Sequence, residues 1–371
     1  MLTLGYYTQM KLRNYFYYCM IMLLVSCKGR EHDPLAFVPP VFPETKQVKV
    51  TVLNNDFLFR MAYKMADLGD YLILSDYDVQ GVIQIFDKKT GDHVRSFGSV
   101  GRGPGEFIIN PIIQVNEDRS VLYAYEGVNG QNRLRGYYIN DVLHKSAPYP
   151  FMEQPVSLSI KDGNQYPGIA SNFLFWRDKR LFFSSVNHRM ELHDSAGKVL
   201  SLYDRFPECA KPSETDSSIF RTSYLGAPVA LKPDMSRFVV ASDLGCIVEI
   251  FRVVESNRIE KVTEKRFFRP EYKIIQNAII HPIDRKTIAG ITKLSVTNSQ
   301  IYARYIGSVY VEGLGHENLN QIAVFDWEGE PICLYVLDWN IYNFVVDAQQ
   351  NRCYLVGTDA GGEVQLGFFD L

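Results

Sequence analysis

The sequence predicts an all-β protein that folds as a six-bladed β-propeller with four-stranded antiparallel blades. Three observations carry this prediction: a two-strand unit recurs six times, turns rich in Asp, Asn and Gly separate the strands, and aromatic residues make up 13% of the chain. Aromatic and β-branched side chains fit the half-buried surface of a pleated sheet. The 371 residues, of which 46% are hydrophobic, are enough for one large core.

The first strand of the recurring unit follows a polar turn and is rich in aromatic residues. Turns such as DLGD and NEDRS precede it, because Asp, Asn and Gly accept the backbone angles that turns require. The six copies of this strand span residues 70–76, 120–126, 179–185, 236–243, 300–306 and 352–358.

The second strand of the unit often ends in an aromatic residue and Asp, and a Gly-containing turn follows several copies. Its six copies span residues 82–87, 133–139, 189–194, 246–252, 321–326 and 363–370. Each unit is too small to bury its own faces, so the units must stack, and antiparallel units that stack radially form a propeller. A β-sandwich is the alternative, but it has about seven to nine strands in roughly 100 residues, fewer than this chain contains.

The two ends of the propeller segment predict how the ring closes. The last unit ends at Leu371 on its third strand, and no sequence remains for a fourth. Residues 47–53 (QVKVTVL) alternate as a strand does and precede the first blade. We expect this N-terminal strand to supply the outer strand of the last blade, which removes an open sheet edge.

The first 45 residues predict a targeting segment and a tether. Lys11 and Arg13 precede a short apolar stretch that ends in Leu-Val-Ser-Cys at Cys27. A secretory signal has this order of charge, apolar run and small residue, and the run is too short to span a bilayer. We therefore expect a lipoprotein signal peptide at 1–26, lipidation at Cys27, a Pro-rich flexible tether at 27–45 and the propeller at 46–371; a plain signal peptide is the alternative.

Two segments resemble known six-bladed propellers. Residues 98–107 (GSVGRGPGEF) resemble the Gly-rich linker of NHL-type propellers. Residues 322–357, with VFDWEGEP and CYLVG, resemble the last blades of the TolB-like propeller lipoproteins of the bacterial cell envelope. The resemblance implies a lipid-anchored location in the envelope, on the periplasmic or the outer-membrane face. It does not imply an activity, because such families include binding proteins, scaffolds and enzymes.

Loop length distinguishes the two faces of the expected ring. Here the four strands of a blade are counted from the innermost outward. The turns between strands one and two of a blade, and between strands three and four, are tight; we call their side the tight-turn face. The connections between blades, and those between strands two and three of a blade, lie on the opposite side, the long-loop face. The long connections there span residues 99–111, 146–170, 207–225, 268–286 and 307–320. Because long loops in a compact domain are commonly functional, the long-loop face is the expected binding face.

Polar residues on the long-loop face are the predicted ligand contacts, around the mouth of the central channel. They are Asp76, Arg102, Glu126, Arg133, His188, Asp243, His316 and Asp359. The sequence predicts no catalytic residue, no metal site and no cofactor. The glycines of residues 98–105 fit turns better than a phosphate loop, and the cysteines have no metal-binding spacing.

The sequence favours a non-catalytic envelope protein that binds or scaffolds a protein, peptide or glycan through the long-loop face. The alternative is a metal-dependent hydrolase or lyase with its site at the channel mouth, held by carboxylates such as Asp76, Glu126 and Asp243. A nucleic-acid partner is not expected, because the net charge is −3 and no basic cluster occurs. Contact with the membrane is expected through the lipid anchor only.

Replacement of Cys27 by Ala tests the anchor. Because the thiol of Cys27 is the predicted site of acylation, the wild type should incorporate radiolabelled palmitate and the Cys27→Ala variant should incorporate none. Cys19→Ala is the matched control and should be labelled like the wild type. Equal labelling of the wild type and Cys27→Ala would contradict lipidation at this residue.

Overall fold

The computed structural model describes residues 36–371 apart from 54–55, 79–80, 129–130, 146–147, 161–169, 185–187, 208–225, 271–272, 276–277, 281–287 and 312–314. The predicted signal peptide and Cys27 lie outside the described residues. Phe37–Leu371 forms one compact unit, which starts upstream of the boundary expected at residue 46. Residues 37–45 belong to this unit because Phe42 packs edge-on against Tyr305 and Phe325. No helix among the described residues has the length and apolarity to cross a membrane.

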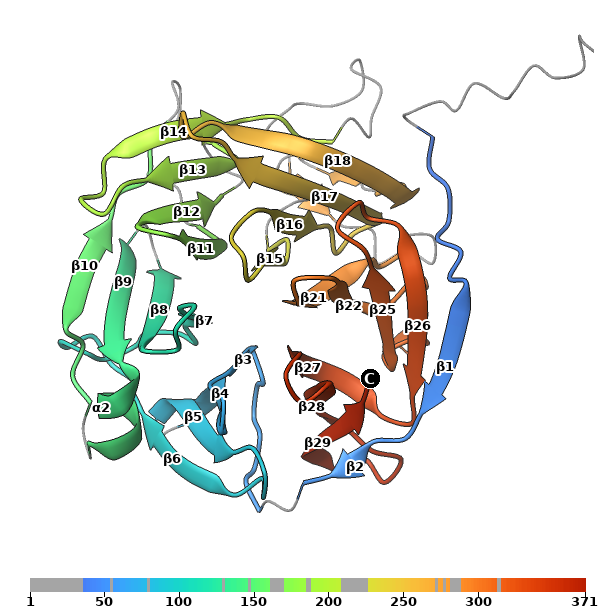
Figure 1. Cartoon of the computed structure of the whole chain (residues 1–371), viewed down its shortest axis with the longest axis horizontal. Coiled ribbons are helices and arrows are strands. Elements are labelled where there is room, and N and C mark those ends of the chain that lie inside the picture. Colours follow the sequence, from blue (N-terminus) through green and yellow to red (C-terminus); the bar gives the residue numbers. More distant parts are fainter. Residues whose placement is uncertain are drawn as a thin grey trace, which may run out of the picture. The chain divides into compact units, whose positions relative to one another are not determined.

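Six antiparallel sheets surround a central axis as the blades of a propeller, as predicted (Figure 1). Blades one to three are β3 (Lys64–Asp67), β4 (Tyr71–Asp78), β5 (Gly81–Asp87) and β6 (His93–Phe97); β7 (Ile112–Val115), β8 (Val121–Val128), β9 (Gln131–Tyr138) and β10 (Met152–Val156); and β11 (Asn172–Trp176), β12 (Lys179–Phe183), β13 (Met190–His193) and β14 (Val199–Tyr203). Blades four to six are β15 (Val229–Leu231), β16 (Phe238–Ala241), β17 (Cys246–Val253) and β18 (Ile259–Phe268); β21 (Ile291–Val296), β22 (Ile301–Tyr305), β25 (Gln321–Phe325) and β26 (Pro331–Leu337); and β27 (Asn340–Asp347), β28 (Arg352–Thr358) and β29 (Val364–Asp370), completed by β2 (Thr51–Val52).

The recurring unit of the sequence corresponds to the second and third strands of each blade. The first strand of each blade lies innermost (Figure 1). These six inner strands carry none of the repeated motifs.

The N-terminal segment closes the last blade, as predicted, and it also adds a strand to blade five. β2 pairs antiparallel with β29, with Thr51 opposite Phe368. The segment expected as one strand at 47–53 is divided: β1 (Glu44–Val48) pairs in parallel with β26 and adds a fifth strand to blade five. Between them the backbone N–H of Val50 donates to Asp338 Oδ1 at 2.9 Å. The N-terminal segment therefore spans the outer edges of two blades.

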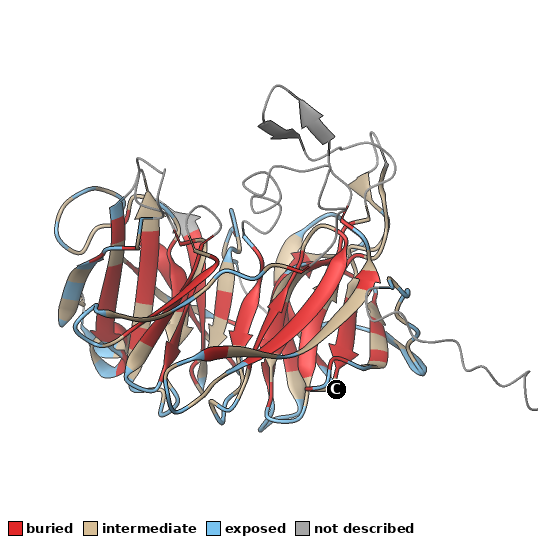
Figure 2. Cartoon of the chain, turned by 90° about the horizontal axis from the view of Figure 1, so that it is seen from above, coloured by how far each residue is buried: buried red, intermediate tan, exposed pale blue. Residues whose placement is uncertain are grey.

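Apolar side chains between neighbouring blades form the core. The buried residues fall into six clusters, one in each gap between adjacent blades. Buried residues lie along the strands, whereas exposed residues gather on the turns (Figure 2). Val50 belongs to the cluster between blades five and six, and Leu53 to the cluster between blades six and one. The closing segment thus contributes side chains to two of the six clusters.

Several long connections contain secondary structure of their own. α2 (Ile139–His144) follows β9, and β10 lies inside the connection expected at 146–170, where it forms the outer strand of blade two. Two small hairpins, β19 (Lys273–Ile275) with β20 (Ala278–Ile280) and β23 (Tyr310–Val311) with β24 (Gly315–His316), extend the connections at 268–286 and 307–320. These segments were predicted to be loops, because each of their helices and strands is too short to give a recognisable pattern in the sequence.

Truncation tests the closing segment. A chain that starts at residue 49 lacks β1, whereas one that starts at residue 56 also lacks β2, Val50 and Leu53. We expect the second chain to unfold at lower urea concentration than the first, because each buried aliphatic side chain contributes roughly 1.5–3 kcal/mol. It should also aggregate through the open edge of β29. Equal stability of the two truncated chains would contradict closure by β2.

Candidate functional site

The predicted contact Asp76 holds the chain where it enters blade one. Its carboxylate is fully buried and accepts hydrogen bonds from the backbone N–H groups of Arg60 (3.0 Å) and Met61. Asn343 of the neighbouring blade donates to the carbonyl oxygens of Ala62 (3.1 Å) and Tyr63 (2.7 Å). These contacts fix residues 60–63 across the long-loop face.

Two further predicted contacts, Glu126 and Arg133, lie opposite each other on β8 and β9. The Glu126 carboxylate is buried, pairs with Arg135 at 3.0 Å and accepts the Ile108 N–H at 2.8 Å. Arg133 lies 3.8 Å from Glu153, which also pairs with Arg135 at 3.2 Å. The fold therefore brings Glu126 and Arg133 together in one ionic group within blade two.

This ionic group anchors the glycine-rich segment 98–107. The Arg135 guanidinium donates to the Glu106 carbonyl at 2.8 Å and lies 4.5 Å from the centre of the Phe107 ring. Gly98 and Gly105 have positive φ angles of 76° and 75°, as expected of turn glycines. The Glu106 carboxylate folds back on the Gly103 N–H at 2.7 Å. Contacts with Arg135 therefore hold this connection between the first two blades in place.

The other five predicted contacts are dispersed. Arg102 is exposed, and His188 Nδ1 lies 2.9 Å from the Asp204 carboxylate. The Asp243 carbonyl accepts the Gly290 N–H at 2.8 Å, and the His316 ring meets the Tyr310 ring edge-on at 5.5 Å. Asp359 caps the turn between β28 and β29 by accepting the N–H groups of Gly361 and Glu363. Whether any of the eight residues contacts a ligand stays a prediction.

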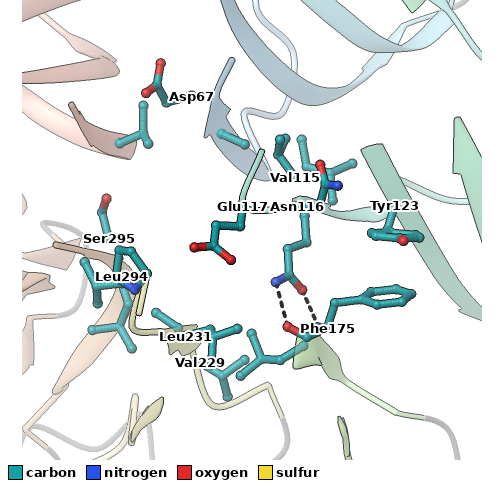
Figure 3. Close-up of a pocket in the computed structure, with 18 of the residues that line it drawn as sticks. Asp67, Val115, Asn116, Glu117, Tyr123, Phe175, Val229, Leu231, Leu294 and Ser295 are labelled. Carbon is teal, nitrogen blue, oxygen red and sulfur yellow. Dashed lines mark hydrogen bonds between the residues drawn. The ribbon is translucent and has the colours of Figure 1, made fainter. Parts of the chain in front are cut away.

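A cavity of about 820 Å³ runs along the axis of the ring, and none of the eight predicted contacts lines it. All six inner strands contribute to its wall (Figure 3). Polar side chains on these strands link neighbouring blades: Gln114 bonds both backbone groups of Phe175, and Ser295 Oγ accepts the Val346 N–H at 2.9 Å. Gln114 and Ser295 therefore already have hydrogen-bond partners within the protein.

A buried ion network closes the cavity wall toward the tight-turn face. Lys88 Nζ contacts Asp67 and lies 2.6 Å from Asp347 Oδ2, and Arg119 lies 2.6 Å from Asp67. Burial alone would raise the pKa of Asp347, but hydrogen bonds from Lys88 and from two backbone amides outweigh burial and lower it. The network connects blades six, one and two. The Glu117 side chain points into the cavity (Figure 3).

Lys64 lines the other end of the cavity, and Lys293 and Arg304 lie beside it in blade five. Lys64 begins β3, and Lys293 lies opposite Arg304 on β21 and β22. Lys64 keeps some contact with water, yet the surrounding protein lowers its pKa to about 8. Burial, together with the charges of Lys64 and Arg304, lowers the pKa of Lys293 to about 8, and burial lowers that of Arg304 to about 10. We call these three residues the cationic mouth.

The cationic mouth was not predicted from the sequence. The one available signal is that Lys64, Lys293 and Arg304 interrupt segments that otherwise read as buried strands. Charged residues are seldom buried without a partner. The three cations lie far apart in the sequence, so only the fold shows that they converge.

Metal-binding and thiol groups give little further chemistry. Within the described ranges, no three His, Cys, Asp or Glu side chains are grouped to hold a metal ion. Cys246, Cys333 and Cys353 are buried free thiols, and burial raises the pKa of each. Buried thiols of raised pKa are poor nucleophiles. Cys209 lies outside the described residues.

Comparison with known proteins identifies the family. The model of a family described as TolB-like 6-blade propeller-like matches residues 41–349. The chain belongs to this TolB-like family. No curated protein sequence matches the chain.

Solved structures agree with the TolB-like fold. The chain is similar to a protein of Bacteroides fragilis named as a proposed exported protein, with 12% identity, a TM-score of 0.55 and coverage of 88% of this chain and 99% of that one. It is also similar to the Cps50 (Swd1) β-propeller domain of Myceliophteria thermophila, with 8% identity, a TM-score of 0.51 and coverage of 87% and 99%. At these identities the likeness shows the fold alone.

The ion network can be tested with Asp347→Asn. At pH 7 the variant should lose about 3 kcal/mol of unfolding free energy, because removing one partner of a buried pair leaves Lys88 undercompensated. The folded pKa of Asp347 is lowered, so its contribution is complete above the unfolded value of about 3.9 and is lost as the pH falls below it. The stability difference between wild type and variant should therefore shrink below about pH 4.

Urea unfolding at several pH values measures this difference. Asp92→Asn changes an exposed carboxylate and is the matched control, for which little change is expected. A deficit for Asp347→Asn that stays constant down to pH 2 would contradict the proposed role of its charge.

Proposed function

We propose that this TolB-like protein is a lipid-anchored, non-catalytic binding protein of the cell envelope that engages a protein, peptide or glycan through its long-loop face. The lipoprotein signal sequence predicted at residues 1–26 and the family support this location. The fold supports the binding role, because a closed ring presents fixed loops around an axial cavity.

One observation carries the choice of face: apolar side chains are exposed near Lys64 at the long-loop end of the blades. Met61, in the connection that enters blade one, is 60% exposed, and Tyr63 and Tyr342 are also exposed. Asp76 and Asn343 hold this connection in place, so its side chains are presented on a fixed backbone. Exposed apolar groups that cluster in this way mark interaction sites.

The hydrolase or lyase alternative gains no support from the carboxylates expected to serve it. Asp76 is engaged by two backbone N–H groups, and Glu126 by Arg135 and a backbone N–H. A metal ion would have to replace these bonds, each of which stabilises a connection between blades. The binding role requires no such rearrangement.

Site-directed photocrosslinking tests the proposed face. A photoreactive amino acid at Met61 should form crosslinks to an envelope component in living cells, because this exposed residue is held at the long-loop end of β4 by Asp76. The same amino acid at Ala196, an exposed residue of the turn between β13 and β14, is the matched control and should give none. Crosslinks from Ala196 but not from Met61 would assign binding to the tight-turn face and refute the proposal.

A further inference from the structure

We propose that the cationic mouth, formed by Lys64, Lys293 and Arg304, binds an anionic group of the ligand, a carboxylate or a phosphate. The inference rests on the proposed function, since it names the chemistry that the long-loop face recognises. It assigns a binding site beside the Lys64 end of the axial cavity, formed by none of the eight predicted contacts.

The three cations converge from two blades. Lys64 lies at the start of β3 and lines the cavity. Lys293 and Arg304 are cross-strand partners on β21 and β22 of blade five, so both side chains project from one sheet face. The Lys293 ammonium reaches the Tyr63 carbonyl at 2.8 Å, directly before Lys64 in the chain. The mouth is therefore formed where blades five and one approach each other around β27.

No carboxylate neutralises these charges within the described part of the chain. Lys293 donates to the Tyr63 carbonyl, and Arg304 to Thr292 Oγ1 at 3.1 Å. The Lys64 ammonium has neither a hydrogen bond nor an ion pair with any described residue. Removing a charge from water without a partner costs free energy, so an unpaired group of this kind indicates a missing ligand.

Three other strongly buried cations show the contrast. Lys88 pairs with Asp67 and Asp347, Arg135 with Glu126, and Arg189 with Glu249. Arg180 is buried as well and has no ion pair among the described residues, but it stands alone, whereas the cationic mouth gathers three such charges. The protein as a whole is acidic, with a net charge of −3.

Unpaired polar atoms at the same place are a second, independent observation. Ser75 lies directly opposite Lys64 in the sheet, is fully buried, and its hydroxyl has no hydrogen-bond partner. The buried Nε of Arg304 also lacks a partner. Buried polar groups are nearly always hydrogen-bonded. A hydroxyl and a guanidinium N–H are both donors to an anion, so one bound anionic group would complement the site.

The surroundings favour an anion carried by an organic ligand. The Tyr63 ring lies 5.0 Å from Lys293 Nζ and is partly exposed, so it offers an apolar surface beside the charges. The cavity of about 820 Å³ lies within the range of about 300–1,000 Å³ typical of small-ligand sites. Arginine matches the planar fork of a carboxylate or the oxygens of a phosphate, and the lysines add charge.

Binding of simple anions to the mature protein tests the site. The wild type, Lys64→Met and Arg304→Gln are titrated calorimetrically with inorganic phosphate and with acetate at constant ionic strength. Lys198→Met changes an exposed turn lysine and is the matched control. At least one anion should bind the wild type and Lys198→Met in the millimolar range or tighter, and at least tenfold more weakly to Lys64→Met and Arg304→Gln. Phosphate binding alone would identify a phosphate ligand, and acetate binding alone a carboxylate.

Thermal melting separates a binding role from a structural one. Without added anion, Lys64→Met should melt at or above the wild-type temperature, because it removes an unpaired charge. A melting temperature well below that of the wild type would overturn the inference, as would failure of both anions to bind the wild type, or equal binding to all variants. If anion binding fails while crosslinking from Met61 persists, the proposed function stands and this inference falls. If the anion binds and crosslinking from Met61 fails, the anion site stands and the proposed binding face falls.

Discussion

Each blade of the ring is one sheet with two apolar faces, and neither face can be buried within its own blade. Every blade therefore depends on both neighbours, which is why the buried residues form one cluster in each gap. An open ring would leave the facing sides of blades one and six exposed. The N-terminal segment prevents this, since Val50 and Leu53 complete the cores on either side of blade six while β2 covers the edge of β29. All other features of the structure rest on this closure.

Buried polar side chains also hold neighbouring blades and their connections together. Gln84, Arg135, Glu191 and Glu249 occupy equivalent positions on the third strands of the first four blades, and all are buried. Glu191 accepts hydrogen bonds from the Ser159 backbone and hydroxyl, and Glu249 pairs with Arg189 of the preceding blade. Such residues hold the connections between blades in place. Lys64, Lys293 and Arg304 differ because, among the residues that the structure describes, no carboxylate pairs with them.

The repeated features of the fold could be predicted from the sequence, and the features that depend on distant contacts could not. The second and third strands repeat their turn and aromatic pattern, so their number and the closure after Leu371 follow from the chain itself. The division of residues 47–53 into two strands depends on Asp338, far away in the sequence. Asp76 and Glu126 resemble ligand-binding residues in the sequence, yet the fold commits both to backbone N–H groups. Lys64 belongs to no motif, and its isolation from carboxylates is visible only in three dimensions.

The central claim is that the axial mouth on the long-loop face contains charges that the protein leaves unneutralised. The most direct test is the titration of the Lys64 ammonium by NMR, with the signal assigned through Lys64→Met. The account predicts a pKa of about 8 in the absence of ligand. A bound anion should raise that pKa, because it stabilises the charged form. A value near 10.4, the ordinary pKa of lysine, in the unliganded protein would show that Lys64 is well solvated or already paired, and would contradict the account.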